Sequence, residues 1–290
     1  MLLRPAERRF TACEKLLKAG AIGDAVNEAL TIAVSDEPND TSFLKIIIPN
    51  ADVDYGGGHS LSLAVKHGLP NHITLLLEQR PNTTSFNNAF DAAMSHSEPT
   101  DQIKYCRMLL EASAPESSAS WTLLKVVRAG RDDLVRLMLQ HNASPNFEGG
   151  ASLISAVHNK NVKILTSLVD NQKASKASLE AAFKVALGIT EEQSRLELVQ
   201  ILLDAGVKGA PLHIALISQS KRGDQNIAII SMLLKYGASV DEQNGEALDN
   251  AAKTGASSLL QSMLHNRKVA YASLSRLVFP STVGLLLSTR

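Results

Sequence analysis

Pairs of adjacent apolar residues recur along this chain at nearly constant intervals. Each pair ends a stretch in which apolar residues return every three or four positions, the spacing of one face of a helix. The pairs are Leu16-Leu17, Ile46-Ile47, Leu76-Leu77, Leu109-Leu110, Met138-Leu139, Leu168-Val169, Leu202-Leu203, Leu233-Leu234, Met263-Leu264 and Leu286-Leu287. Successive pairs are 29 to 34 residues apart, except that the last follows after 23. Such regularity predicts a repeat protein, in which each short repeat buries its apolar face against its neighbours.

A second apolar marker runs in phase with the first. A large apolar residue precedes a smaller one by three positions, which places both on one face of a helix. The marker pairs are Leu30/Ala33, Leu61/Ala64, Phe90/Ala93, Leu123/Val126, Leu153/Ala156, Phe183/Ala186, Leu212/Ala215 and Leu248/Ala251. The smaller partner lets a neighbouring helix approach closely. Each repeat should therefore be a short helix, a turn, a second short helix and a connector.

The two markers predict one array across residues 1–290, with about nine repeats and partial ends. The second helices should end near residues 17, 47, 77, 110, 139, 169, 203, 234, 264 and 287. The prolines fit this frame, because none has to lie inside a helix, where it would cost about 3 kcal/mol.

Individual repeats resemble a known family. The stretch Ala210-Pro211-Leu212-His213-Ile214-Ala215 is similar to the T-P-L-H-x-A motif of an ankyrin repeat, with Ala210 in place of the threonine. The segment from Trp121 to Asn146 follows the family pattern over a full helical pair, with Trp121 where threonine is usual. The resemblance covers roughly residues 10–269 and implies an all-α, ankyrin-like helical solenoid of paired antiparallel helices.

The connectors depart from the family pattern. Only 6 residues lead from Gly206 to Leu212, and most other connectors use 10 or 11. A full ankyrin repeat uses about 14 residues here to build a β-hairpin finger. We therefore expect vestigial fingers, with one of them missing.

Composition and charge exclude several classes of protein. Lys+Arg and Asp+Glu number 29 each, so the basic excess of a nucleic-acid or acidic-membrane binder is absent. No apolar run approaches the roughly 20 residues of a membrane span, and no signal peptide opens the chain. Cys13 and Cys106 fall at one repeat position, three repeats apart, which is too far for a disulfide. These features and the resemblance predict a cytoplasmic or nuclear protein.

Catalytic motifs are not found. The sequence contains no Walker loop and no H-E-x-x-H, C-x-x-C or G-x-S-x-G motif. The Gly56-Gly57-Gly58 run could offer amides to a phosphate, but a flexible connector before a helix cap explains it more simply. Asp52 and Asp54 could suggest a cation site, although they fall where an ankyrin repeat has its finger turn. We expect no enzyme activity, no cofactor and no metal site.

Aromatic side chains at solvent-facing positions are the best binding candidates, because such residues are enriched at interface hot spots. Trp121 is expected at the start of a first helix, and Tyr55 and Phe147 fall in connectors. Each could instead cover the apolar edge of its own repeat, and the nearby charges could be solvated. The candidate partner-binding residues are Tyr55, His59, Trp121, Lys125, Arg128, Phe147, Glu148, Asp241 and Glu242.

By resemblance, such an array is a non-catalytic protein-protein interaction module that holds a protein or peptide along a concave groove. It would be the scaffold, adaptor or sensor portion of a larger regulator, monomeric as an isolated array. Two alternatives stay open. The chain could be a purely structural spacer, or the non-catalytic part of an enzyme whose active domain lies elsewhere.

Overall fold

The computed structural model describes residues 5–36, 40–170 and 174–265, and within these ranges the protein is all-α, as predicted. Seventeen α-helices and three short 3-10 helices occur there, and no β-strand. No connector in the described ranges is therefore paired as a β-hairpin. The chain divides into two compact units, residues 1–147 (unit 1) and 148–290 (unit 2).

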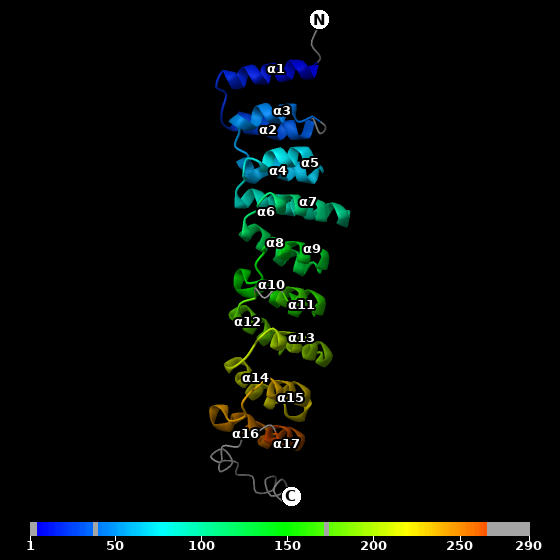
Figure 1. The fold of residues 1–290 in the computed structure, drawn as a ribbon, viewed down its shortest axis with the longest axis vertical. Helices are drawn as coiled ribbons and strands as arrows, with labels where there is room; N and C mark the ends of the chain where they lie inside the picture. Colours follow the sequence, from blue (N-terminus) through cyan, green and yellow to red (C-terminus); the bar gives the residue numbers. More distant parts are fainter. Residues whose placement is uncertain (1–4, 37–39, 171–173, 266–290) are drawn as a thin grey trace, which may run out of the picture. The chain divides into compact units, whose positions relative to one another are not determined.

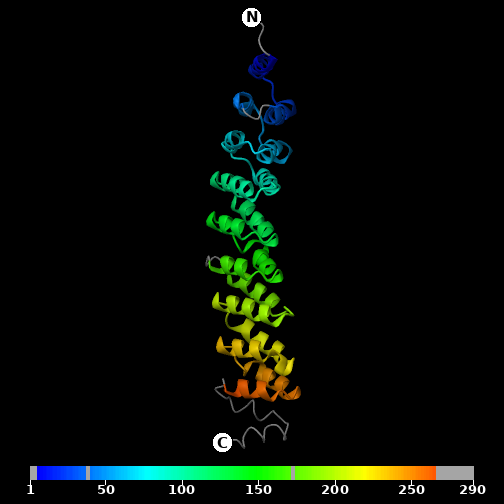
Figure 2. The ribbon, with the colours of Figure 1, turned by 90° about the vertical axis from the view of Figure 1, so that its right-hand side faces the viewer.

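Unit 1 is built from helices that pack in two rows. The first helices α2, α4, α6 and α8 contact one another in sequence, while α3 packs on α1 and α5, and α7 packs on α9 (Figures 1 and 2). The bounds are α1 Pro5–Lys18, α2 Asp24–Asp36, α3 Ser42–Ile47, η1 Ile48–Asn50, α4 Tyr55–Lys66, α5 Pro70–Leu77, α6 Thr83–Met94, α7 Pro99–Glu111, α8 Glu116–Arg128 and α9 Asp132–Gln140.

Unit 2 repeats this arrangement. Its second helices α11, α13, α15 and α17 pack on one another in order, and the first helix α14 packs on α16. The bounds are α10 Phe147–His158, α11 Val162–Asp170, α12 Lys176–Ala186, α13 Glu192–Asp204, α14 Ala210–Ser220, η2 Gly223–Asn226, α15 Ile227–Lys235, η3 Glu242–Gly245, α16 Glu246–Lys253 and α17 Ser257–His265. The first residue of α10 is the last residue of unit 1.

Local sequence sets where these helices begin. Proline occupies the first turn of α5, α7 and α14, where a missing N–H removes no helical hydrogen bond. The Asn82 side chain caps α6 by accepting a hydrogen bond from the Ser85 amide at 3.0 Å. Ser175 caps α12 in the same way, from the Ser178 amide at 3.2 Å.

The core lies along the faces that the apolar markers predict. The large residues of the first-helix markers are all at most 2% exposed, and their smaller partners are buried as well. In the described residues, each second helix ends at the predicted apolar pair or one residue after it. The pair Leu286-Leu287 lies outside the described residues.

Candidate functional site

The connectors that carry several candidate residues share an unusual backbone. Gly56, Gly57 and Gly58 all have positive φ angles, between 61° and 73°, so this connector makes a left-handed turn before its helix. Residues 148–150 and 243–245 do the same, although Glu148, Gln243 and Asn244 are not glycines. Three successive residues with positive φ angles turn the chain sharply, so that the regular helix begins directly after them.

Asp54 fixes the first of these turns to the following repeat. Its carboxylate accepts hydrogen bonds from the Asn82 amide at 2.9 Å and from the Ser85 hydroxyl at 2.6 Å. Gly58 lies so close to Ser85 that a Cβ at Gly58 would come within 2.8 Å of the Ser85 Cα. The turn is therefore a close joint between α4 and α6, rather than the flexible connector considered from the sequence.

Tyr55 and His59 lie on the two sides of this turn and line a common groove. The groove has a volume of about 510 Å³, and Ile32 and Glu28 of α2 form its other wall. Ile32 is 58% exposed, which is unusual for so large an apolar side chain. The structure therefore brings these two predicted residues together beside an exposed apolar surface.

Trp121, Lys125 and Phe147 also come together, although 26 residues separate the first from the last. The Trp121 and Phe147 rings meet edge to face, with centroids 6.3 Å apart and planes at 68°. The Lys125 ammonium lies 5.1 Å from the centre of the Trp121 ring, within cation–π range. All three side chains are partly exposed, so this cluster forms part of the surface of unit 1.

Asp91 belongs to the same cluster and was missed by the sequence analysis. Its carboxylate forms an ion pair with Lys125, from the preceding first helix α6, and holds the ammonium beside Trp121. The side chains of Lys125 and Asp91 are 30% and 52% exposed. The only sequence feature that could have indicated this pairing is position. Asp91 directly follows the marker Phe90 and lies about one repeat before Lys125. We call Asp91, Trp121, Lys125 and Phe147 the aromatic cluster.

The expected position of Trp121 within its helix was wrong. Because Pro115 provides the residue before α8, the helix begins at Glu116 and Trp121 lies well inside it. Tyr55 and Phe147, expected in connectors, are each the first residue of a helical segment that opens with a left-handed turn. Arg128 is exposed at the end of α8, and Glu148 is exposed directly after Phe147.

The two acidic candidates of unit 2 lie in a different connector. Glu242 approaches His213, with 3.8 Å between the carboxylate and the His213 Nε2 atom. The His213 Nδ1 atom accepts a hydrogen bond from the Ser239 amide at 2.9 Å, so the ring joins α14 to the connector that follows α15. Asp241 is half-buried in that connector. This group contains no aromatic residue, and its evident role is to join repeats.

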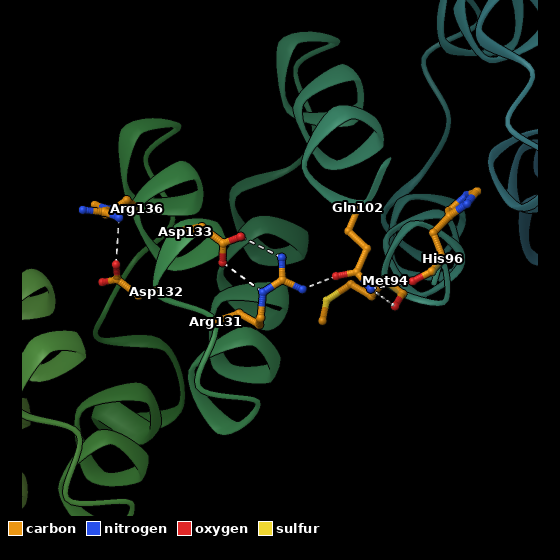
Figure 3. A network of polar contacts seen from close by, with 7 residues as sticks. All are labelled: Met94, His96, Gln102, Arg131, Asp132, Asp133 and Arg136. Atoms are coloured by element: carbon orange, nitrogen blue, oxygen red, sulfur yellow. Dashed lines mark hydrogen bonds and ion pairs between the residues drawn. The ribbon is translucent and has the colours of Figure 1, made fainter. Parts of the chain in front are cut away.

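A polar network ties the inter-helix turns of unit 1 to one another (Figure 3). Arg131 donates two hydrogen bonds to Asp133, at 3.0 and 2.7 Å, and a third to the Gln102 side chain. Gln102 in turn donates to the backbone carbonyls of Met94 at 3.1 Å and His96 at 2.6 Å. One arginine thus connects the turn before α9 to the turn before α7.

His96 extends this network by one more repeat. Its Nε2 atom donates to the Val65 carbonyl of α4 at 2.8 Å, and its ring stacks on Tyr105 with centroids 4.8 Å apart. The side chains of Arg131, Gln102 and His96 thus each bond to partners within the protein. Such a network suits a structural role, because a binding site needs donors or acceptors that remain available.

The potential metal ligands of the described ranges are dispersed. No group of three or more His, Cys, Asp or Glu side chains there could hold a metal ion. The largest resolved pKa shift is a structural one: burial raises the pKa of the Cys106 thiol to about 12, which keeps it protonated and unreactive. No helix among the described residues is both long and apolar enough to span a membrane.

No protein-family model matches this chain, and no curated protein is significantly similar to it in sequence.

Proposed function

We propose that this chain is a non-catalytic protein-binding module, built as an ankyrin-like solenoid with vestigial fingers and acting in the cytoplasm or nucleus. Its partner is a protein or peptide, and neither nucleic acid nor membrane is its target. The proposal of ankyrin type draws on the T-P-L-H-like motif around Leu212 and on the two rows of packed helices in each unit.

The aromatic cluster is the observation that carries this proposal. Trp121 and Phe147 are large, rigid side chains that stay partly exposed although the repeats offer apolar neighbours. Lys125 adds a charge whose position is fixed by Asp91. Tryptophan and neighbouring charged groups are the usual centre of an interface, where truncation of one such residue costs about 2 kcal/mol or more.

The proposal can be tested by affinity capture with the full chain as bait, using lysate from the source organism. In the variant, Tyr55, Trp121 and Phe147 are all replaced by alanine. We expect at least one protein to bind the native chain saturably and to lose about 30-fold or more in affinity with the variant. Because Trp121 is the only tryptophan of the chain, its fluorescence should also change when the captured partner is added back.

A matched control replaces three exposed residues of unit 1 that lie outside the aromatic cluster, Gln79, Arg107 and Glu116, by alanine. This control should bind like the native chain, and circular dichroism should show that both variants keep their helix content. If no partner distinguishes the aromatic variant from the control, the proposal is wrong and the structural-spacer hypothesis is favoured instead.

A further inference from the structure

Unit 2 contains a groove that has no role in the function proposed above. It lies between the first helices α12 and α14 and has a volume of about 530 Å³, within the range typical of binding pockets. Phe183, Leu187, Pro211 and Ile214 supply apolar walls. Ile214 is 60% exposed, the most exposed of the large apolar side chains in the described part of unit 2.

The first helix α14 begins late relative to its marker Leu212, next to this groove. In α12, Ser178 lies five residues before the marker Phe183 and packs on Gly150 of the preceding first helix, where an added Cβ would come within 2.6 Å of it. The corresponding position before Leu212 is Val207, which precedes the start of α14 at Ala210. The shortened connector thus leaves α14 without a helical residue at the position that Ser178 takes in α12.

The charges around the groove are mainly positive. Lys184 and Arg222 are exposed on its rim, and neither forms an ion pair with any residue that the structure describes. The one acidic residue on the rim, Glu180, is already paired with Lys176 at 3.6 Å. The rim therefore carries two positive charges without an ion-pair partner among the described residues.

We propose that the groove between α12 and α14 binds an acidic protein segment that presents apolar side chains at helical spacing. The apolar walls would take the leucine-like side chains, and Lys184 and Arg222 would pair with carboxylates on either side. The inference rests on the protein-binding role proposed above, but it uses none of the residues of the aromatic cluster.

The test uses the full chain and a fluorescein-labelled probe peptide of about 14 residues, roughly four helical turns, made of alternating Glu-Glu and Leu-Leu pairs. Fluorescence anisotropy should show saturable binding that weakens as salt is added. Reversing both rim charges, Lys184→Glu with Arg222→Glu, should weaken binding about tenfold or more. A probe with lysine in place of glutamate should bind this double variant more tightly than the native chain.

Two further variants separate the groove from the rest of the surface. Ile214→Ser removes an exposed apolar wall residue and should weaken binding of the acidic probe. Lys235→Glu with Lys253→Glu makes an equal charge change at exposed positions outside the lining and should leave binding unchanged. Absence of saturable binding to the native chain, or equal binding by the rim variant and this control, would overturn the inference. Trp121→Ala should leave probe binding unchanged, so failure here and failure of the aromatic cluster are distinguishable.

Discussion

Replacement of Gly58 by alanine tests how closely the repeats approach one another. Gly58 is buried, has a φ angle of +73°, and would place an added Cβ within 2.8 Å of the Ser85 Cα and also against the Ser85 side chain. Gly56 belongs to the same left-handed turn with a φ of +61°, but its added Cβ would meet only the His59 Cβ, at 3.5 Å. Gly56→Ala and Gly58→Ala therefore impose the same backbone strain, but only Gly58→Ala also creates a steric clash with Ser85.

The expected magnitudes follow from these two contributions. Holding an alanine in the left-handed region costs about 1–2 kcal/mol, which is the whole expected loss of unfolding free energy for Gly56→Ala. Overpacking against a neighbour that cannot move away adds about 1–3 kcal/mol. Gly58→Ala should therefore lose about 2–5 kcal/mol, because the atom it approaches most rigidly is backbone.

Equilibrium urea unfolding measures the unfolding free energy of both variants. Unfolding is monitored by helix content and by the fluorescence of Trp121, which reports on unit 1. Unit 2 offers an independent copy of the comparison. Gly149→Ala meets nothing within 4 Å, while Gly150→Ala would come within 2.6 Å of the Ser178 Cβ. If Gly56→Ala and Gly58→Ala reduced stability equally, the close joint between α4 and α6 would be refuted.

Two further predictions concern the polar network and the thiols. Arg131→Met should cost about 1–2 kcal/mol more unfolding free energy than Arg136→Met at pH 7, because Arg131 also bonds to Gln102 of the preceding repeat, whereas exposed Arg136 pairs with Asp132 of its own helix. The hydrogen bond from Arg131 lowers the pKa of Asp133 in the folded protein. The stabilisation from the Arg131–Asp133 pair is therefore complete above the unfolded pKa of about 3.9 and is lost as pH falls through the lower folded pKa. Urea unfolding should show the difference in stability between the two variants shrinking at acid pH. An aromatic disulfide reagent should label half-buried Cys13 in the native protein. It should label Cys106, which is 0% exposed and has a pKa of about 12, only after unfolding. Equal labelling rates for the two thiols would contradict the structure.

The positions of the helices could be predicted because burial acts at a fixed period. Leu123 and Val126 are both 0% exposed, since a large and a smaller residue three positions apart face the same neighbour. The pair Leu202-Leu203 likewise lies at the end of α13, one residue before its last, Asp204. Such positions depend only on local spacing, which a single sequence contains.

Contacts between repeats could not be predicted in the same way. Lys125 and Asp91 are 34 residues apart, and Arg131 and Gln102 are 29 apart, so each pairing depends on the exact offset of neighbouring helices. The sequence analysis found Lys125 as a candidate but had no means of choosing Asp91 as its partner. The left-handed turn at Gln243 and Asn244 was also hidden, because neither residue is a glycine.

The joint made by Gly58 and Ser85, and again by Gly150 and Ser178, has a consequence for how such a chain can be lengthened or shortened. Each joint takes its glycine from one repeat and its serine from the next. Because Gly58 lies in α4 and Ser85 in α6, a breakpoint between repeats and a breakpoint in the turn after α4 would both separate these partners. An exchanged repeat would therefore have to fit at both of its faces, with its glycine against the serine of the next repeat and its serine against the glycine of the repeat before.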